Sequence, residues 1–290
     1  MDGSELLSMV NDGEYTLETL KGELGKNALV FLPVNTTSTL DNVAYRTSSN
    51  SFRAGNDIVI ADRFPFFSPY DIQVDAANWA KYERTITYNG YNPIEYATIV
   101  LPFTIDVTSD GLHHNEDNDG VDFTLATMKT NETNVLAKKE DSKFDYYADA
   151  YFTELSATSE ANKPYIVTLA SAGENAFKAH CKGSLVKATT DDGVFEGETA
   201  NGIIDDVRYD FTNTGTYTGK EIADASTASE TVFYFGNNYF LDSKTLTSGK
   251  SLKILPFRAF YDYKAGAGAK MTSFRIVFGE NENSGTTGIN

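Results

Sequence analysis

The 290-residue sequence contains very little cysteine and histidine. Cys181 is the only cysteine, which excludes a disulfide framework and any cysteine-rich metal site. His113 and His114 are adjacent, and neighbouring residues of an extended backbone point in opposite directions, so the two do not readily share one zinc ion. The same geometry separates His180 from Cys181, and we therefore favour no thiol nucleophile there.

Basic side chains are also scarce. The chain has 24 Lys and Arg against 41 Asp and Glu, a formal net charge of −17. Such a surface repels nucleic-acid phosphates and anionic lipid headgroups, so we expect no nucleic-acid partner. No stretch approaches the roughly 20 apolar residues of a membrane span, and we expect no transmembrane segment in this chain. The first ten residues lack the basic start and apolar run of a signal peptide, and we interpret the chain as a fragment.

Long amphipathic helical patterns are missing as well, whereas aromatic residues are plentiful. The 17 Tyr and 19 Phe, together with abundant Thr and Val, suit pleated, half-buried surfaces. Residues 82–90 alternate with a period of two, so that Tyr82, Arg84 and Ile86 share one face. Residues 58–60 are apolar throughout, which predicts a strand that is covered on both sides. Strands are expected at 27–35, 41–47, 56–62, 64–74, 82–90, 96–107, 147–155, 164–170, 176–181, 206–213, 231–241, 251–263 and 271–279.

These strands predict an all-β protein, an antiparallel β-sandwich with a small N-terminal β region. We place the N-terminal β region at 1–80, where it forms the end of a preceding repeat array, and the sandwich at 81–290. Alternating Val, Ile, Phe and Tyr residues from two sheets are expected to face one shared core, with polar residues pointing outward.

The order of several short segments carries a family resemblance. The segments are NALVFLP, FPFFSPYDIQVDAANWAKYERTI, TIVLPFTIDV, ANKPYIV, FYFGNNYFL, LKILPFRAFYDY and the closing FRIVFGENENSGTTGIN. This order resembles a C-terminal β-rich module of secreted or surface proteins of Bacteroidetes-type bacteria, which often follows leucine-rich or other repeats. The resemblance implies a secreted or cell-surface location, a role in display or adhesion, and no catalytic residues. The loop 110–122 stands where the family has a short turn.

That loop is the best candidate for a cation site. Its Asp117, Asp119 and Asp122, with Asn115 and Gly120 between or beside them, supply the oxygen ligands that calcium prefers. An EF-hand loop starting at Asn115 needs a Glu at position 12, and Ala126 stands there instead. We favour a solvated loop and no cofactor, with calcium bound by the three aspartates as the alternative.

Aromatic side chains offer a second kind of site. Trp79 lies in AANWAKY, which we interpret as a linker that leaves its ring exposed for stacking on a sugar. The run 234–239 is a further candidate for such a platform, although alternating aromatics more often fill a core. Trp79 is therefore our candidate ligand-binding residue.

No catalytic signature is present in the sequence. It lacks a G-x-S-x-G elbow, an H-E-x-x-H helix and a glycine-rich phosphate loop. We therefore predict a non-enzymatic structural or adhesion-like module that contacts a protein, the matrix or a glycan. The alternatives are a carbohydrate-binding module and a glycoside-type hydrolase with paired carboxylates.

Overall fold

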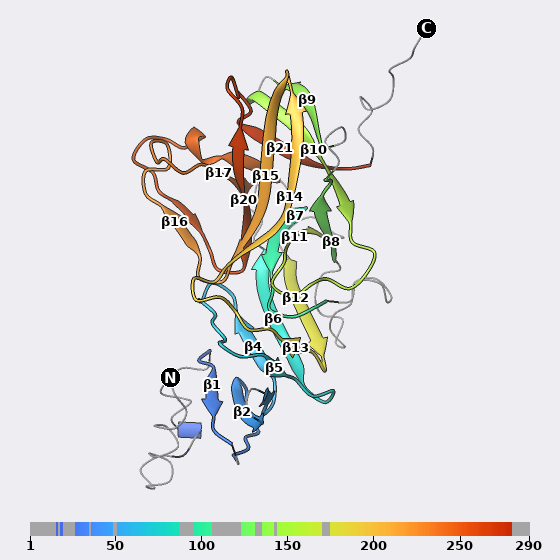
Figure 1. The fold of residues 1–290 in the computed structure, drawn as a ribbon, viewed down its shortest axis with the longest axis vertical. Coiled ribbons are helices and arrows are strands. Elements are labelled where there is room, and N and C mark those ends of the chain that lie inside the picture. Colours follow the sequence, from blue (N-terminus) through green and yellow to red (C-terminus); the bar gives the residue numbers. More distant parts are fainter. Residues whose placement is uncertain are drawn as a thin grey trace.

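The computed structural model describes residues 16, 18–19, 27–34, 36–48, 51–86, 95–105, 123–130, 135–141, 144–169 and 175–279. In this part of the chain nearly all regular structure is β, as the sequence predicts; the exceptions are a short 3₁₀ helix, Ser243–Thr245, and helical backbone at residues 18–19. No helix among these residues is long and apolar enough to cross a membrane. The molecule is elongated, with β1 and β2 near one end and the largest sheet toward the other (Figure 1).

The largest sheet has eleven strands, and it runs in the order β14-β15-β20-β17-β18-β21-β10-β8-β11-β7, with β9 added beside β10. Its strands are β7 (Tyr96–Val100), β8 (Phe123–Met128), β9 (Leu136–Asp141), β10 (Phe144–Glu154), β11 (Pro164–Leu169), β14 (Val194–Ile204), β15 (Val207–Thr216), β17 (Val232–Gly236), β18 (Tyr239–Asp242), β20 (Arg258–Ala265) and β21 (Ser273–Phe278).

Three smaller sheets complete the described structure. Their strand orders are β1-β2-β3-β5-β13, β12-β6-β4 and β16-β19. The strands are β1 (Val30–Leu32), β2 (Val43–Ser48), β3 (Ser51–Ala54), β4 (Ile58–Ala61), β5 (Ile72–Gln73), β6 (Trp79–Ile86), β12 (Asn175–Lys182), β13 (Leu185–Val186), β16 (Lys220–Ile222) and β19 (Leu252–Ile254).

Four strand pairs among the described residues are parallel, although most pairs are antiparallel as predicted. They are β1 with β2, β3 with β5, β4 with β6 and β10 with β21. Parallel partners cannot be joined by a tight hairpin, so each such pair brings together segments separated along the chain. The fold therefore depends on long-range pairing more than a chain of hairpins would.

The eleven-stranded sheet curls until strands from distant places in its order meet. Gly215 of β15 lies against Val100 of β7, where an added Cβ would stand 2.7 Å from the Val100 Cβ. Nearby, the Ala259 amide of β20 donates a 3.0 Å hydrogen bond to Thr98 Oγ1 of β7. A side chain at position 215 would hold these two layers apart.

Both faces of the curled sheet are buried, so the core is divided into clusters. On β11, Tyr165 and Val167 belong to one cluster, and the intervening Ile166 belongs to another, as the period of two requires. A third, smaller cluster lies around β16, β19 and Phe260. The fold is all-β and sandwich-like, as predicted. It has several core clusters in place of the single one expected, because a curled sheet has an inside and an outside and buries both.

The first cluster joins segments on both sides of residue 80. Ile58 and Ile60 of β4 share it with Val100, Phe177 and the more distant Phe257. The division of the chain at residue 80 stays a prediction. The expectation that residues 58–60 are covered on both faces was wrong, because Val59 is 36% exposed.

Both LPF segments lie outside the strands to which they were assigned. Leu101–Phe103 follows β7, and Leu255–Phe257 connects β19 to β20. Proline lacks the amide that a sheet ladder needs, which explains why each segment marks a strand boundary. Phe257 and Phe103 are nevertheless fully buried.

Candidate functional site

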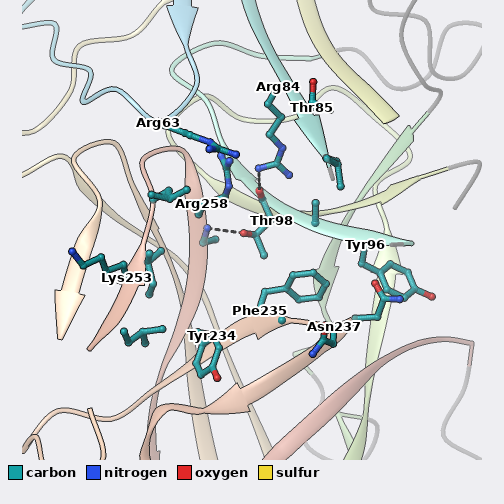
Figure 2. Close-up of a pocket in the computed structure, with 18 residues that line it drawn as sticks. Arg63, Arg84, Thr85, Tyr96, Thr98, Tyr234, Phe235, Asn237, Lys253 and Arg258 are labelled. Carbon is teal, nitrogen blue, oxygen red and sulfur yellow. Dashed lines mark hydrogen bonds between the residues drawn. The ribbon is translucent and has the colours of Figure 1, made fainter. Parts of the chain in front are cut away.

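A cavity of about 360 Å³ lies where β6, β7, the β17–β18 hairpin and β19–β20 meet. Four of its lining side chains are basic: Arg63, Arg84, Lys253 and Arg258. None of the eighteen described residues that line it is acidic. In a protein with 41 acidic side chains this is a local reversal of charge. We call this cavity the arginine pocket (Figure 2).

Arg84 is the buried member of the arginine pocket. It lies on β6 in a row with Tyr82 and Ile86, whose side chains point into the protein as strand alternation requires. Arg84 is only 7% exposed, and its Nη1 donates a 3.1 Å hydrogen bond to the Thr98 carbonyl. Its guanidinium carbon lies 5.4 Å from the centre of the Phe177 ring. These contacts fix the guanidinium at the wall of the pocket.

Arg84 makes no direct ion pair among the described residues, although the nearby charge of Asp62 acts on it. Its Nε is buried and makes no hydrogen bond within the described structure. Burial, followed by the nearby charge of Arg258, lowers the pKa of Arg84 to about 10. The guanidinium is therefore still protonated at neutral pH. A buried, incompletely paired cation is costly to the fold, so its presence calls for a functional explanation.

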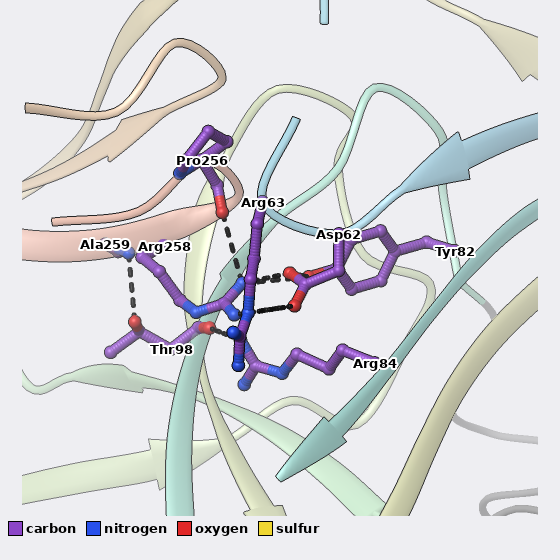
Figure 3. Close-up of polar contacts among 8 residues, drawn as sticks. All are labelled: Asp62, Arg63, Tyr82, Arg84, Thr98, Pro256, Arg258 and Ala259. Atoms are coloured by element: carbon purple, nitrogen blue, oxygen red, sulfur yellow. Dashed lines mark hydrogen bonds and ion pairs between the residues drawn. The ribbon is translucent and has the colours of Figure 1, made fainter. Parts of the chain in front are cut away.

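Arg258 sits beside Arg84 and is held by Asp62 (Figure 3). Its Nη1 and Nη2 donate to the two Asp62 carboxylate oxygens over 2.8 and 3.2 Å, a bidentate ion pair. The buried Tyr82 hydroxyl donates to Asp62 over 2.6 Å and accepts from Arg258 over 2.9 Å. The Pro256 carbonyl accepts a further 3.1 Å hydrogen bond from Arg258. Arg258 is thereby fixed in position at the pocket wall.

Asp62 compensates Arg258 without entering the arginine pocket. Its carboxylate is not among the pocket's lining residues and instead lines a neighbouring cavity with Asp41 and Glu83. Burial alone would raise the pKa of Asp62, but the hydrogen bonds and charge of Arg258, with the Tyr82 hydroxyl, hold it below its usual value of 3.8. Asp62 is therefore ionised at neutral pH. Because its carboxylate lies outside the arginine pocket, the charged groups of the described residues that line the pocket are all cationic.

Two strained residues flank this ion pair in sequence. Arg63 follows Asp62 and has φ 67°, and Phe257 precedes Arg258 and has φ 62°. Left-handed backbone is unfavourable for residues with a Cβ, particularly for a large aromatic one. Such strain persists where the surrounding structure imposes it, and it is concentrated at functional sites. Arg63 itself, and Arg258 directly after Phe257, both line the arginine pocket.

Replacing Arg63 by Gly is expected to stabilise the protein, because glycine adopts φ 67° without a steric penalty. The Arg63 side chain is 63% exposed, and its 3.5 Å contact with Asp62 is a weak surface pair. We expect the free energy of unfolding to rise by about 0.5–1 kcal/mol, measured by urea denaturation. Arg208→Gly, which lies near the turn end of the β14–β15 ladder and pairs with Ile203, is the control and should lower stability. A loss of stability in Arg63→Gly would contradict the assignment of strain.

Aromatic and amide side chains lie at the other end of the pocket from the arginines. Tyr96, Tyr234, Phe235 and Asn237 are placed there (Figure 2). Asn237 and Asn238 have φ 54° and 65° and form the two-residue turn between β17 and β18. This is the backbone of a type I′ hairpin turn, in which Asn is favoured. The turn carries Tyr234 and Phe235 on its first strand.

The hairpin is attached to β7 by a side chain of its turn. Asn238 Oδ1 accepts a 3.1 Å hydrogen bond from the Glu95 amide, at the start of β7. Phe233 and Phe240 of the same hairpin are fully buried, whereas Tyr234 and Phe235 are partly exposed to the pocket. Within the run 234–239, residues 234–238 line the pocket, and Tyr234 and Phe235 also pack against core clusters.

Trp79, the predicted stacking residue, lies elsewhere. It is the first residue of β6 and not part of a linker, and it is half-buried. Its amide donates to Asp57 over 2.8 Å, Lys182 Nζ lies 5.1 Å from the centre of its ring, and the His180 ring is 6.2 Å away. The interpretation as an exposed linker was wrong, because Trp79 pairs with Lys182 across the β6–β12 ladder. A stacking role for its ring stays a prediction.

The predicted calcium ligands Asp117, Asp119 and Asp122 lie outside the described residues. Within the described ranges, no group of three or more His, Cys, Asp or Glu side chains could hold a metal ion. His180 instead bonds to Glu83, with Nε2 and Oε1 2.7 Å apart, and Cys181 is partly buried against the first core cluster. The calcium alternative therefore stays a prediction.

Comparisons of the chain with protein-family models, curated proteins and solved structures found no match. The resemblance to a Bacteroidetes-type C-terminal module thus stays a prediction. The arginine pocket itself was missed from the sequence. One signal was available, because Arg84 occupies the same alternating row as Tyr82 and Ile86 and so points toward the interior. No local sequence feature connects that row of β6 residues with Arg258.

Proposed function

We propose that this chain is a non-catalytic binding module whose arginine pocket takes a negatively charged group of its ligand. The observation that carries the proposal is Arg84, a buried guanidinium at the wall of a cavity with no acidic lining residue in the described structure. Among the described residues Arg84 makes no direct ion pair with a carboxylate, and Asp62 acts on its charge only from a distance. A bound anion would supply a direct counter-charge.

The distribution of charge supports an anionic ligand. Arg258 is neutralised by Asp62, so Arg84 is left as the buried positive charge, with the more exposed Arg63 and Lys253 nearby. Guanidinium groups recognise carboxylate, sulfate and phosphate through paired N–H donors. In a half-enclosed cavity such contacts are stronger than in water. The surrounding acidic surface would repel extended polyanions and leave small anionic groups as ligands.

The protonation states in the pocket support binding over catalysis. Arg84 has a pKa of about 10 and stays charged at neutral pH. Burial raises the pKa of Tyr96 and of Tyr234, each further increased by a nearby acidic side chain. General acid–base catalysis works best with a group whose pKa is near the working pH. Arg84, Tyr96 and Tyr234 do not titrate there, which favours a module that holds its ligand without transforming it.

The sequence predicts a structural or adhesion-like module, and the arginine pocket favours ligand binding as the task of that module. A secreted or cell-surface module that contacts a protein, the matrix or a glycan would present the pocket to the outside. The carbohydrate-binding alternative gains support from the tyrosines opposite the arginines. The hydrolase alternative gains none, because Asp62 is held by Arg258 and Tyr82. The surface location and the family resemblance remain part of the proposal.

Arg84→Met is the test of this function. We expect benzoate, glucuronate, sulfate or phosphate to bind the native protein and to shift the Arg84 Nε–Hε resonance in NMR titrations. The variant should bind the same anion about 10- to 100-fold more weakly, since hydrogen bonds to charged groups are worth about 1.5–3 kcal/mol. Methionine fills a similar volume, so the free protein should be at least as stable as the native one.

Arg53→Met is the matched control, because Arg53 is a half-exposed arginine paired with Asp75 and does not line the pocket. Its affinity for the anion should equal that of the native protein. The proposal fails if none of the four anions binds, or if the two methionine variants weaken binding equally.

A further inference from the structure

The arginine pocket carries a more specific inference, which rests on the proposed function. The pocket has two chemically different ends, with guanidinium groups at one and aromatic rings and an amide at the other (Figure 2). A simple inorganic anion would use only the first end. The ligand that uses both has an anionic group joined to a body with apolar faces and polar edges.

The aromatic end is suited to a sugar ring. Tyr96 and Tyr234 are both partly exposed and line the cavity, and Phe235 lies between them in the view of Figure 2. Aromatic faces pack against flat apolar surfaces, while tyrosine hydroxyls and asparagine amides exchange hydrogen bonds with polar groups. A pyranose ring presents C–H groups on its faces and hydroxyls around its edge, which matches this mixture.

The aromatic end is also held in a fixed shape. The left-handed Asn237–Asn238 turn and the Asn238–Glu95 hydrogen bond attach the β17–β18 hairpin to β7. On the first strand of the hairpin, Phe233 is buried in the core, which fixes the neighbouring Tyr234. A preformed surface loses little conformational entropy when the ligand binds.

The charge of the buried part of the pocket indicates a monoanion. Asp62 pairs with Arg258 through both carboxylate oxygens, which leaves Arg84 as the buried cation of the pocket without a direct ion pair. A planar carboxylate matches a guanidinium edge with two parallel hydrogen bonds. The cavity volume of about 360 Å³ is near the lower limit for ligand pockets, which suits a sugar residue and not a long chain.

We propose that the arginine pocket binds an acidic sugar of the uronic acid class. The sugar carboxylate lies against Arg84 and Arg258, and the ring packs on the tyrosines at the opposite end. A ligand with this chemistry is either a free sugar acid or a single uronic acid residue of an otherwise neutral glycan. Both present the same carboxylate and ring to the pocket.

The test compares probes that differ in one feature at a time. Isothermal titration calorimetry of the native protein would use methyl glucuronoside, methyl glucoside, cyclohexanecarboxylate and glucose 6-phosphate. The glucoside lacks the charge, the cyclohexane acid lacks the hydroxyls, and the phosphate changes the anion. We expect the glucuronoside to bind at least about 10-fold more tightly than each of the others. A glucuronate-containing oligosaccharide would then distinguish a glycan residue from a free sugar acid.

Substitutions in the pocket test which residues contact the sugar ring and which contact its carboxylate. Tyr234→Ala should weaken glucuronoside binding by about 2- to 10-fold and leave cyclohexanecarboxylate binding less affected. Tyr239→Ala is the control, because Tyr239 lies on the same hairpin but does not line the pocket. Arg84→Met should reduce binding of every carboxylate probe.

The outcomes separate this inference from the proposed function. If cyclohexanecarboxylate binds as tightly as the glucuronoside, the sugar class is wrong while anion binding stands. Tighter binding of glucose 6-phosphate would likewise overturn the carboxylate assignment. Equal affinity for the neutral glucoside would show a carbohydrate site that does not use Arg84. If no anionic probe binds, both proposals fail.

Discussion

Asp62→Asn is expected to lower the free energy of unfolding by about 3–5 kcal/mol, because it leaves the Arg258 guanidinium without its carboxylate. The two side chains are 14% and 19% exposed, so water does not readily replace the lost partner. The Tyr82 hydroxyl loses its charged acceptor as well. Urea denaturation followed by tryptophan fluorescence would measure the change, since Trp79 is the only tryptophan.

Asp75→Asn is the control for this prediction. Asp75 pairs with Arg53 over 3.4 Å, and both side chains are nearly half exposed. Its loss should cost less than about 1 kcal/mol. The double variant Asp62→Asn/Arg258→Met should be more stable than Asp62→Asn alone, because the unpaired charge is gone. If Asp62→Asn costs no more than Asp75→Asn, the ion pair does not stabilise this part of the fold.

The same ion pair predicts a dependence on pH. The folded-state pKa of Asp62 is held below its usual value of 3.8. A lowered carboxyl pKa contributes stability that is fully present above the unfolded-state pKa and is lost as the pH falls through the folded-state pKa. The stability difference between the native protein and Asp62→Asn should therefore be constant near neutrality and shrink below about pH 4. A difference that grows on acidification would contradict this.

Phe274→Ala is expected to lower the free energy of unfolding by about 3–5 kcal/mol through the cavity that it creates. Phe274 is fully buried on β21 at the centre of an aromatic cluster. Ring centroids lie 4.8 Å away for Phe240, 5.2 Å for Phe233, 5.6 Å for Phe211 and 5.7 Å for Tyr261. These residues come from β15, β17, β18 and β20, so one truncation loosens five strands together.

Phe278→Ala, near the end of the same strand, is the matched control. Phe278 is partly exposed, and its ring centroid lies 6.3 Å from that of Tyr96. Its truncation should cost clearly less than that of Phe274, with both measured by thermal and urea unfolding. Equal losses would mean that the cluster around Phe274 is not the centre of this part of the core.

Local sequence features predicted the β class and many of the strands. They missed β8, β9 and β14, and they treated the β17–β18 hairpin as one strand at 231–241. Alternation along 82–90 correctly placed Tyr82, Arg84 and Ile86 on one face of a strand. The same alternation placed a cation, Arg84, among inward-facing residues, and this was the one sequence signal for the arginine pocket. The sequence predictions failed where the burial of a side chain depends on segments that are distant along the chain. Val59 is apolar but exposed, and Trp79 begins a strand because β12 pairs with it.

The sequence alone determined that this chain forms strands and which faces of many of them point inward, because side-chain direction alternates within a few residues of backbone. Only the tertiary structure decided which strands meet. Asp62 and Arg258 are 196 residues apart, and the parallel pairing of β10 with β21 joins Asp149 to Arg275 across 126 residues. Such contacts depend on how a curled sheet closes over several clusters at once, and no short segment encodes that closure. The arginine pocket forms only where β6, β7, the β17–β18 hairpin and β19–β20 converge.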